Sequence, residues 1–280
     1  MKSVAVMLVA CLLVTAVARA GPATPAKEPV YSFGVVPQFE QRKLYAVWKP
    51  IVDALEQRTG LRFQLVTTLK IPDFEKAYYR GEFDFVYVNP YHVARLHGPQ
   101  AYIPLAADQA PLRGIIVVRR DAPIHSPTEL NGKTVAFPSA NAVGSSLLVR
   151  ADLEQIHHVQ FEPLYVKTHS SVYLHVAKNL VAAGGGVEKT LREQDEALRS
   201  QLRVIYTTRA CPSHPIAAHP RVPASVRELV RRELFALGDT PEGKAMLEQV
   251  PITRLVPVNY DDYAVMLGWG LEKYWQPIEP

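Results

Sequence analysis

Cysteine is nearly absent from this sequence, and blocks of like charge are absent too. Only 2 cysteines occur in 280 residues, which excludes a disulfide framework as the basis of the fold. Lysine and arginine total 31 against 27 acidic residues, and no basic run is present, which argues against a nucleic-acid-binding surface. With 48% hydrophobic residues, the chain can bury one large core or two modest ones.

The most apolar segment lies at the N-terminus. Lys2 precedes an almost wholly apolar stretch over 4–17, and Ala18-Arg19-Ala20 forms a small-residue cleavage site. This pattern predicts a cleaved signal peptide over 1–20, because a membrane span requires about 20 apolar residues. A lipoprotein box at Leu8–Cys11 is the less favoured alternative, since cleavage there would leave an apolar tail. We expect a soluble, monomeric, periplasmic protein with a flexible leader over 21–29.

Strand and helix patterns alternate through the first part of the mature chain. Strand patterns occupy 31–36, 62–67 and 83–88, and a helix with apolar residues at helical spacing over 44–55 ends at Gly60. Such alternation is typical of an α/β domain with a largely parallel sheet.

A continuous strand pattern over 113–123 predicts that the chain leaves one lobe and enters another. The second unit is expected to contain helix 143–155, strand 161–166, helix 170–178, a short strand near 180–183, helix 187–198 and strand 202–207. The proline-rich segment 211–223 fits a return crossing, and helices follow at 224–237, 241–249 and 260–275.

These crossings divide the chain into two α/β lobes. We expect lobe 1 to comprise 30–117 plus 211–280 and lobe 2 to comprise 118–210, with hinges near 116–120 and 208–215. Two lobes joined by two crossings indicate a hinged ligand trap, although many α/β enzymes share this order of elements.

Polar residues gather at three places where a strand is expected to end and a helix to begin. These places are Asn89 before Pro90, the stretch Ser139–Ser146, and Thr168–Ser170. A helix start presents unpaired N–H groups and a partial positive charge, which together bind anions. The three starts, with Tyr91, Asn141, Ser145 and His169 beside them, predict a site for a tetrahedral or carboxylate anion. The alternative is that each cap only stabilises its own helix.

The candidate catalytic and metal-binding motifs lack the residue spacing that their chemistry requires. Gly144-Ser145-Ser146 lacks the second glycine of a nucleophile elbow. The run GGGVEKT over 184–190 lacks the spacing of a phosphate loop, so its glycines predict close backbone approach. No pair among the 9 histidines has helical His-x-x-x-His spacing. We expect no enzymatic activity, cofactor or metal; a secreted serine hydrolase using Ser145 or Ser146 with His169 is the remaining enzymatic alternative.

Several segments, in order along the chain, carry a family resemblance. They are FGVVP, GEFDFVYVNPYHVA, VVRRDAPIHSPTELNGKTVAFPS, THSSVYLHVAKNLVAAGGG and TPEGKAMLE. The sequence resembles the periplasmic phosphate/phosphite/phosphonate-binding proteins, the PhnD-like branch of type II solute-binding proteins. The resemblance implies two lobes of mixed sheets flanked by helices, a small oxyanion as ligand and an ABC importer as partner. A sensor that partners a histidine kinase is the alternative.

The resemblance also implies which residues contact the ligand. The family's cleft uses an aromatic residue after the second strand, matched by Phe74, and the strand end that includes Tyr87. Asn141 and Ala142 stand where phosphonate-binding members have hydroxyl groups. An ammonium subsite would fall at Glu188 or Lys189, depending on register, and at His214. The expected ligand contacts are Phe74, Tyr87, Asn89, Tyr91, Ser139, Asn141, Ser145, Thr168, His169, Ser170, Glu188 and His214.

Overall fold

The computed structural model describes residues 29–96, 100–250 and 252–278. The predicted signal peptide and nearly all of the predicted leader lie outside the described residues. Within the described residues, no helix is both long enough and apolar enough to cross a membrane.

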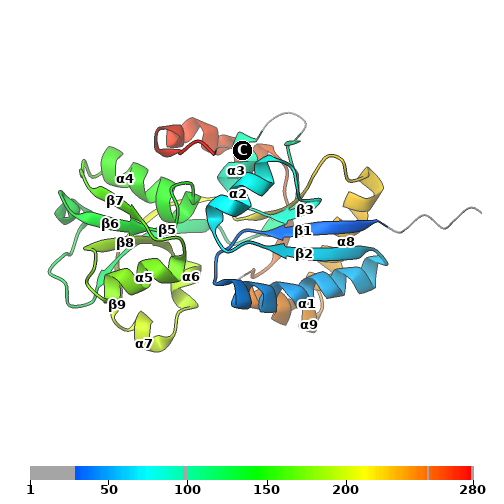
Figure 1. Cartoon of the computed structure of the whole chain (residues 1–280), viewed down its shortest axis with the longest axis horizontal. Coiled ribbons are helices and arrows are strands. Elements are labelled where there is room, and N and C mark those ends of the chain that lie inside the picture. The colour runs from blue at the N-terminus through cyan, green and yellow to red at the C-terminus, as the bar shows by residue number, and fades with distance from the viewer. Residues whose placement is uncertain (1–28, 97–99, 251, 279–280) are drawn as a thin grey trace, which may run out of the picture.

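Two mixed sheets, each flanked by helices, form two lobes that lie side by side (Figure 1). The first sheet contains β1 (Val30–Val35), β2 (Arg62–Thr67), β3 (Phe85–Tyr87), β4 (Ile103–Asp108), β10 (Pro215–Ala218) and β11 (Leu255–Pro257). The second contains β5 (Leu112–Arg119), β6 (Thr134–Phe137), β7 (Glu162–Tyr165), β8 (Ala183–Val187) and β9 (Leu202–Cys211). The strand orders are β11-β4-β10-β3-β1-β2 and β7-β6-β8-β5-β9.

Both sheets combine a parallel part with an antiparallel part. In the first, β1 runs parallel to β2 and β3, whereas β10 and β11 pair antiparallel with their neighbours. In the second, β6 runs parallel to β7 and β8, whereas β5 pairs antiparallel with β8 and β9. The mixed sheets implied by the resemblance are confirmed. The expectation of a largely parallel sheet is wrong, because the periodicity does not reveal β4, β10 and β11. These strands are short or contain proline, and they pair antiparallel with their neighbours.

The helices of lobe 1 cover its sheet as the apolar spacing predicts. They are α1 (Gln41–Thr59), α2 (Ile71–Tyr79), α3 (Pro90–Arg95), α8 (Ala224–Gly238) and α9 (Pro241–Gln249). The Glu40 carboxylate accepts N–H bonds at the start of α1, and Gly60 ends the helix in the left-handed conformation at φ 69°, as expected. Trp48 of α1 packs on Phe33 in the sheet, with ring centroids 5.7 Å apart.

Lobe 2 buries both faces of its inner strand β5. Its helical elements are η2 (Pro127–Leu130), η3 (Val143–Leu148), α4 (Val149–Gln155), α5 (His169–Ala177), α6 (Glu188–Arg192) and α7 (Glu196–Arg199). Ile116 and Val118 of β5 pack in the cluster that includes α4, and Ile115 and Val117 pack in the cluster that includes α5. A strand covered on both sides has a continuous apolar sequence, which explains the run around 113–119. The helix expected over 187–198 is two short helices, and the strand expected near 180–183 lies at 183–187.

The chain passes between the sheets in two short segments. Because β4 ends at Asp108 and β5 begins at Leu112, the first crossing spans 109–111. The second spans 212–214, between β9 and β10. The first crossing therefore precedes the expected hinge near 116–120, because all of β5 pairs within the second sheet. The second crossing lies within the expected hinge at 208–215.

The end of the chain runs over the junction between the lobes (Figure 1, red). The helix expected over 260–275 is instead α10 (Asp261–Ala264) followed by the 3₁₀ turns η4 (Val265–Trp269) and η5 (Leu271–Tyr274), with Gly270 left-handed at φ 68° between the turns. We refer to residues 265–278 as the C-terminal strap. Tyr274 and Gln276 of this strap form hydrogen bonds with lobe 2, so it connects the two lobes a third time.

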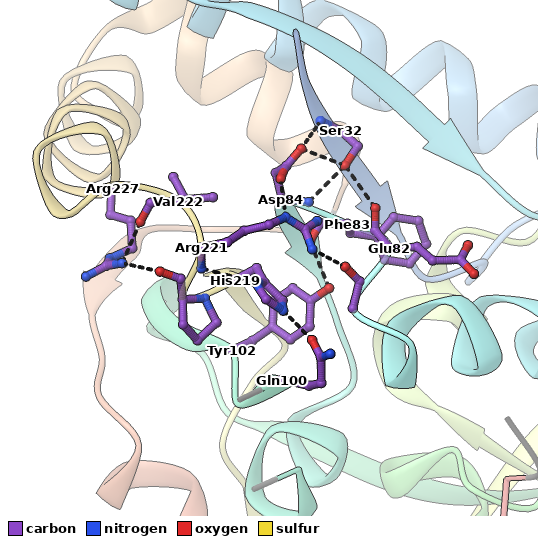
Figure 2. A network of polar contacts seen from close by, with 12 residues as sticks. Ser32, Glu82, Phe83, Asp84, Gln100, Tyr102, His219, Arg221, Val222 and Arg227 are labelled. Atoms are coloured by element: carbon purple, nitrogen blue, oxygen red, sulfur yellow. Dashed lines mark hydrogen bonds and ion pairs between the residues drawn. The ribbon is translucent and has the colours of Figure 1, made fainter. Parts of the chain in front are cut away.

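A polar network secures the far edge of the first sheet (Figure 2). The Asp84 carboxylate accepts bonds from Ser32 N at 2.8 Å, Ser32 Oγ at 3.0 Å and Arg221 Nε at 2.7 Å. Ser32 stands near the start of β1 and Asp84 directly precedes β3. The network therefore lies at the amino ends of these parallel strands, opposite the edge where the polar helix starts occur.

Candidate ligand-binding cleft

The carboxyl ends of the parallel strands from both sheets meet at the junction between the lobes. Asn89, after β3, donates from Nδ2 to the backbone oxygen of Asn141, after β6, at 3.3 Å. Lys189, after β8, pairs with Asp108 at the end of β4. These contacts show that the loops beyond the strand ends of the two sheets lie against each other.

The first helix start has the predicted form. Asn89 caps α3 through Oδ1, which accepts the Tyr91 N–H at 3.2 Å, and Pro90 occupies the first helical position. The same side chain therefore orders α3 and contacts lobe 2. Tyr91 is fully buried, and its ring meets the ring of Trp275 in the strap at 5.6 Å.

The second helix start differs from the expected capped helix. Its N-cap is Ala142, which has no side chain capable of capping, and Ser139 Oγ instead accepts the Asn141 N–H at 3.3 Å. The helix opens with the π-helical turn η3, in which Ala142 O accepts from both Ser146 and Leu147. Ser145 Oγ is buried and has no hydrogen-bond partner within the described residues. Such turns occur frequently at functional sites.

Glycines in the second sheet allow this turn to lie directly on the strands. A Cβ at Gly114 would lie 2.1 Å from Gly144 O, and one at Gly185 would lie 2.1 Å from Ser145 O. The close backbone approach expected of the glycine run is confirmed, although these glycines form β8 itself. The approach fixes where the first N–H groups of η3 are presented, and a helix leaves those groups without internal partners.

The third helix start brings His169 into the protein interior. Thr168 caps α5, with Oγ1 accepting the Ser171 N–H at 3.0 Å, and Ser170 is half-buried in the first turn. The ring of His169 is buried, and its Nδ1 lies 3.3 Å from Thr190 Oγ1. Burial lowers the pKa of His169 to about 4, so the ring is neutral near pH 7 and can donate from one nitrogen.

A small inner cavity lies between the lobes on the side of the hinge. It has a volume of about 20 Å³, and Tyr87, Lys189, Thr190 and His214 are among its lining residues. The rings of Tyr87 and His214 stack with centroids 5.4 Å apart. Gln38 Nε2 donates to His214 Nε2 at 3.2 Å, which holds the histidine as a neutral acceptor at that nitrogen.

Positively charged and protonatable groups from both lobes face this region. Burial, together with the nearby positive charge of Lys189 and the neighbouring rings of His169 and His92, lowers the pKa of His214 to about 3. His92 belongs to α3, and its Nε2 lies 2.8 Å from the buried carboxylate of Glu75. His214, Lys189 and, through Thr190, His169 therefore lie together where the lobes meet, whereas His92 faces Glu75.

Asp108 provides the balancing charge at the hinge. Its Oδ2 pairs with Lys189, and its Oδ1 accepts from Thr253 Oγ1 at 2.6 Å and from Arg254 N at 3.2 Å. Burial opposes ionisation of Asp108, but the bonds from Lys189, Thr253 and Arg254 together hold the pKa of its carboxyl below its ordinary value. Lys189 is thus anchored across the junction in an ion pair.

A larger outer cavity of about 420 Å³ opens between α2, the second helix start and the strap. Its lining residues are Lys70, Pro72, Glu75, Lys76, Pro138, Ser139, Ala140, Asn141, Tyr165, Lys167, Gln276, Pro277 and Ile278. The Asn141 amide is already engaged at this wall, because Oδ1 accepts from Gln276 N at 2.9 Å and Nδ2 donates to Gln276 O at 3.0 Å.

Of the twelve expected ligand contacts, Tyr87 and His214 line the inner cavity and Ser139 and Asn141 line the outer one, and the other eight line neither. Phe74 is buried in lobe 1, stacked on Phe83 with ring centroids 5.3 Å apart. Glu188 is exposed and pairs with Arg192 at 3.0 Å, and Lys189 is the neighbour that faces lobe 1. Within the described residues, no group of three or more His, Cys, Asp or Glu side chains is placed to hold a metal ion.

Sequence reasoning missed several residues of the junction. Gln38, Asp108 and Thr190 line the inner cavity, and Gln276 lies opposite Asn141. Asp108 ends a strand that the pattern did not reveal. Nothing in the sequence places Gln276 near residue 141, because only tertiary structure brings together positions 135 residues apart.

The fold and the cleft together define a two-lobed, type II periplasmic binding protein. The model of the family described as "ABC transporter, phosphonate, periplasmic substrate-binding protein" matches residues 33–263. The chain belongs to this family, and it is a non-enzymatic, phosphonate-binding periplasmic component of an ABC transporter. The hydrolase alternative is thereby excluded, and Ser145 Oγ makes no hydrogen bond to His169.

Solved structures share the fold at low sequence identity. A binding-protein component of an ABC phosphonate transporter from Pseudomonas aeruginosa is 16% identical, with TM-score 0.78 over 88% of this chain and 87% of that one. PhnD1 from Prochlorococcus marinus, in complex with methylphosphonate, is 14% identical, with TM-score 0.77 over 87% and 98%. A Xanthomonas citri protein bound to chloride ion is 19% identical, with TM-score 0.72 over 88% and 98%. No match was found among curated proteins.

Proposed function

We propose that the chain captures a small phosphonate-type oxyanion at the junction between its lobes, beside the inner cavity. The observation that carries this proposal is that Lys189 and His214 line the inner cavity together with Thr190, and that the buried ring of His169 lies 3.3 Å from the Thr190 hydroxyl. A bound anion would accept hydrogen bonds from these groups, and its negative charge would favour the charged form of Lys189.

The donors for the oxyanion come from the helix starts. The first N–H groups of η3 and α5 have no partners inside their helices, and the neutral ring of His169 adds a donor. Ser139, Ser145, Thr168 and Ser170 supply hydroxyl groups close to these starts. Asn89, Tyr87 and Tyr91 order the lobe 1 wall of the same site, while His214 stands at its hinge side.

Ligand entry requires the lobes to part. The inner cavity of about 20 Å³ has room for roughly one water molecule, which is too little for a tetrahedral anion. The crossings at 109–111 and 212–214 are the short segments about which such a movement can occur. The ligand favours the closed form only to the extent that it binds that form more tightly.

We further propose that residues 1–20 direct export and are removed, and that the permease of the importer recognises the closed lobes. Support for the export step comes from the apolar segment and the Ala18-Arg19-Ala20 site. The family membership supports the importer as the partner.

Thermal unfolding in the presence of methylphosphonate, phosphate, phosphite, sulfate or acetate tests the proposed site. An anion that binds only the folded protein, at 100 times its Kd, adds about 2.7 kcal/mol to the free energy of unfolding. We expect His169→Gln to lose most of the increase in Tm, and His125→Gln, an exposed lobe 2 variant, to keep it. The proposal is overturned if no phosphonate or phosphate raises Tm, or if His169→Gln responds as the unmutated protein does.

A further inference from the structure

The outer cavity is large enough to hold part of a ligand beyond its oxyanion. Its volume of about 420 Å³ lies within the range of small-molecule sites, roughly 300–1,000 Å³. Residues from α2 line one side, residues of lobe 2 line the other, and Gln276 to Ile278 of the strap close a third. A molecule in this cavity would therefore touch both lobes and the strap.

Three lysines give this cavity its charge. Lys70 and Lys76 approach from lobe 1 and Lys167 from lobe 2. Over residues 29–96, 100–250 and 252–278, none of these three ammonium groups takes part in an ion pair. The one carboxylate among the lining residues is Glu75, which is buried and pairs with His92 at 2.8 Å. The cavity is therefore positively charged.

The cavity adjoins the place where we put the oxyanion. Ser139 and Asn141 belong both to its wall and to the second helix start. Lys167 stands directly before the cap of α5 with φ 78°. This left-handed conformation is uncommon for a residue with a side chain, and such strain occurs preferentially at functional sites.

We propose that the outer cavity receives the organic substituent of the phosphonate and that this substituent carries a second acidic group, such as a carboxylate. The inference rests on the proposed function, because it assumes that the phosphonate group lies at the adjoining helix starts. A substituent with an ammonium group would meet three like charges, whereas a carboxylate would meet three opposite ones. The ligand class is therefore the carboxyalkyl phosphonates rather than the aminoalkyl phosphonates.

Calorimetric titration with three phosphonates that differ in the substituent tests this inference. We expect 3-phosphonopropionate to bind most tightly, methylphosphonate more weakly and 2-aminoethylphosphonate most weakly. The double variant Lys76→Gln/Lys167→Gln should weaken 3-phosphonopropionate binding by about tenfold, the effect of removing two charges near a partly exposed carboxylate. Its affinity for methylphosphonate should change by less than about twofold, because that ligand does not reach the lysines.

Lys178→Gln is the matched control, since Lys178 is an exposed residue at the other end of α5, and it should leave all three affinities unchanged. If none of the three phosphonates binds, the proposed function itself fails. If methylphosphonate binds but 3-phosphonopropionate binds no more tightly, the function stands and the acidic-substituent inference is overturned. The inference also fails if the double variant weakens both ligands equally.

Discussion

The side-chain amide of Asn141 and the backbone of Gln276 form two hydrogen bonds, at 2.9 and 3.0 Å, that join lobe 2 to the C-terminal strap. Arg150 adds to the same junction by donating to Tyr274 O at 2.7 Å and Ala140 O at 2.6 Å. The strap follows the second crossing, after which the chain has returned to lobe 1. These bonds therefore hold the lobes in their observed arrangement.

Replacing Asn141 by alanine should loosen the lobes. The variant loses both bonds to Gln276, and we expect the free energy of unfolding to fall by about 1–2 kcal/mol. Because these bonds connect the lobes, the ligand-free protein should also become more open. Small-angle X-ray scattering of the ligand-free protein would report this as a larger radius of gyration.

Asn131→Ala is the control for this measurement. Asn131 Oδ1 accepts from Gln160 N at 3.0 Å, so the substitution removes an asparagine bond within lobe 2 without touching the strap. Its radius of gyration should match that of the unmutated protein. An unchanged radius for Asn141→Ala would show that the strap does not hold the lobes together.

Asp108→Asn should destabilise the protein more than the loss of one surface ion pair. The substitution removes the charge that pairs with Lys189 and weakens the bonds from Thr253 and Arg254. Breaking a largely buried pair by removing one charge costs about 3–5 kcal/mol. Urea denaturation would measure the loss. Asp121→Asn, which removes an exposed pair with Arg119, should change the free energy of unfolding by less than about 1 kcal/mol; equal effects would contradict the importance of the hinge pair.

Much of the architecture was predictable because its signals are local. Asn89 with Pro90, Gly60 and the alternation over 62–67 each depend on neighbouring residues, and each occurs as predicted. The resemblance extended this to the mixed sheets. The sequence did not predict the strands β4, β10 and β11, because they are short, contain proline or pair antiparallel with distant segments.

The sequence predicts which loops meet at the site. It predicts the orientation of single side chains less well. Glu188 and Lys189 are the first two residues of α6, so the residue at which β8 ends and the helix begins decides which of them faces lobe 1. The structure turns Lys189 inward and leaves Glu188 exposed. Asn141 remains an expected ligand contact, and its hydrogen-bond partner Gln276 comes from the far end of the chain, where no local pattern marks it.

Acid should destabilise the protein through His169 and His214. Their folded-state pKa values are lowered to about 4 and about 3, from an ordinary value of 6.5. The unfolded chain therefore binds protons more readily below pH 6.5, so the stability is complete above pH 6.5 and is lost as the pH falls toward 4. Between pH 6.5 and 5 each histidine removes about 2 kcal/mol from the free energy of unfolding.

Urea denaturation at pH 7.5 and pH 5.0 checks this dependence. Between the two pH values, His214→Gln should lose less of its free energy of unfolding than the unmutated protein does. The reason is that the variant lacks the histidine that takes up a proton on unfolding. His125→Gln, with an exposed side chain, should retain the full loss. An unchanged pH dependence in His214→Gln would mean that the pKa of His214 is not lower in the folded state than in the unfolded state.

Asp84→Ala should lower the stability of the protein without lowering its affinity for the ligand. The substitution removes the acceptor for Ser32 and Arg221 at the far edge of the first sheet (Figure 2), and we expect a loss of about 1–2 kcal/mol because the half-buried Ser32 donors lose their acceptor. Since this network lies at the strand ends opposite the cleft, the affinity for methylphosphonate should stay within about twofold. Glu82→Ala, which removes only an exposed pair with Arg80 at 3.6 Å, should change neither quantity. A large loss of affinity in Asp84→Ala at a temperature where the protein is folded would show instead that the network is coupled to the cleft.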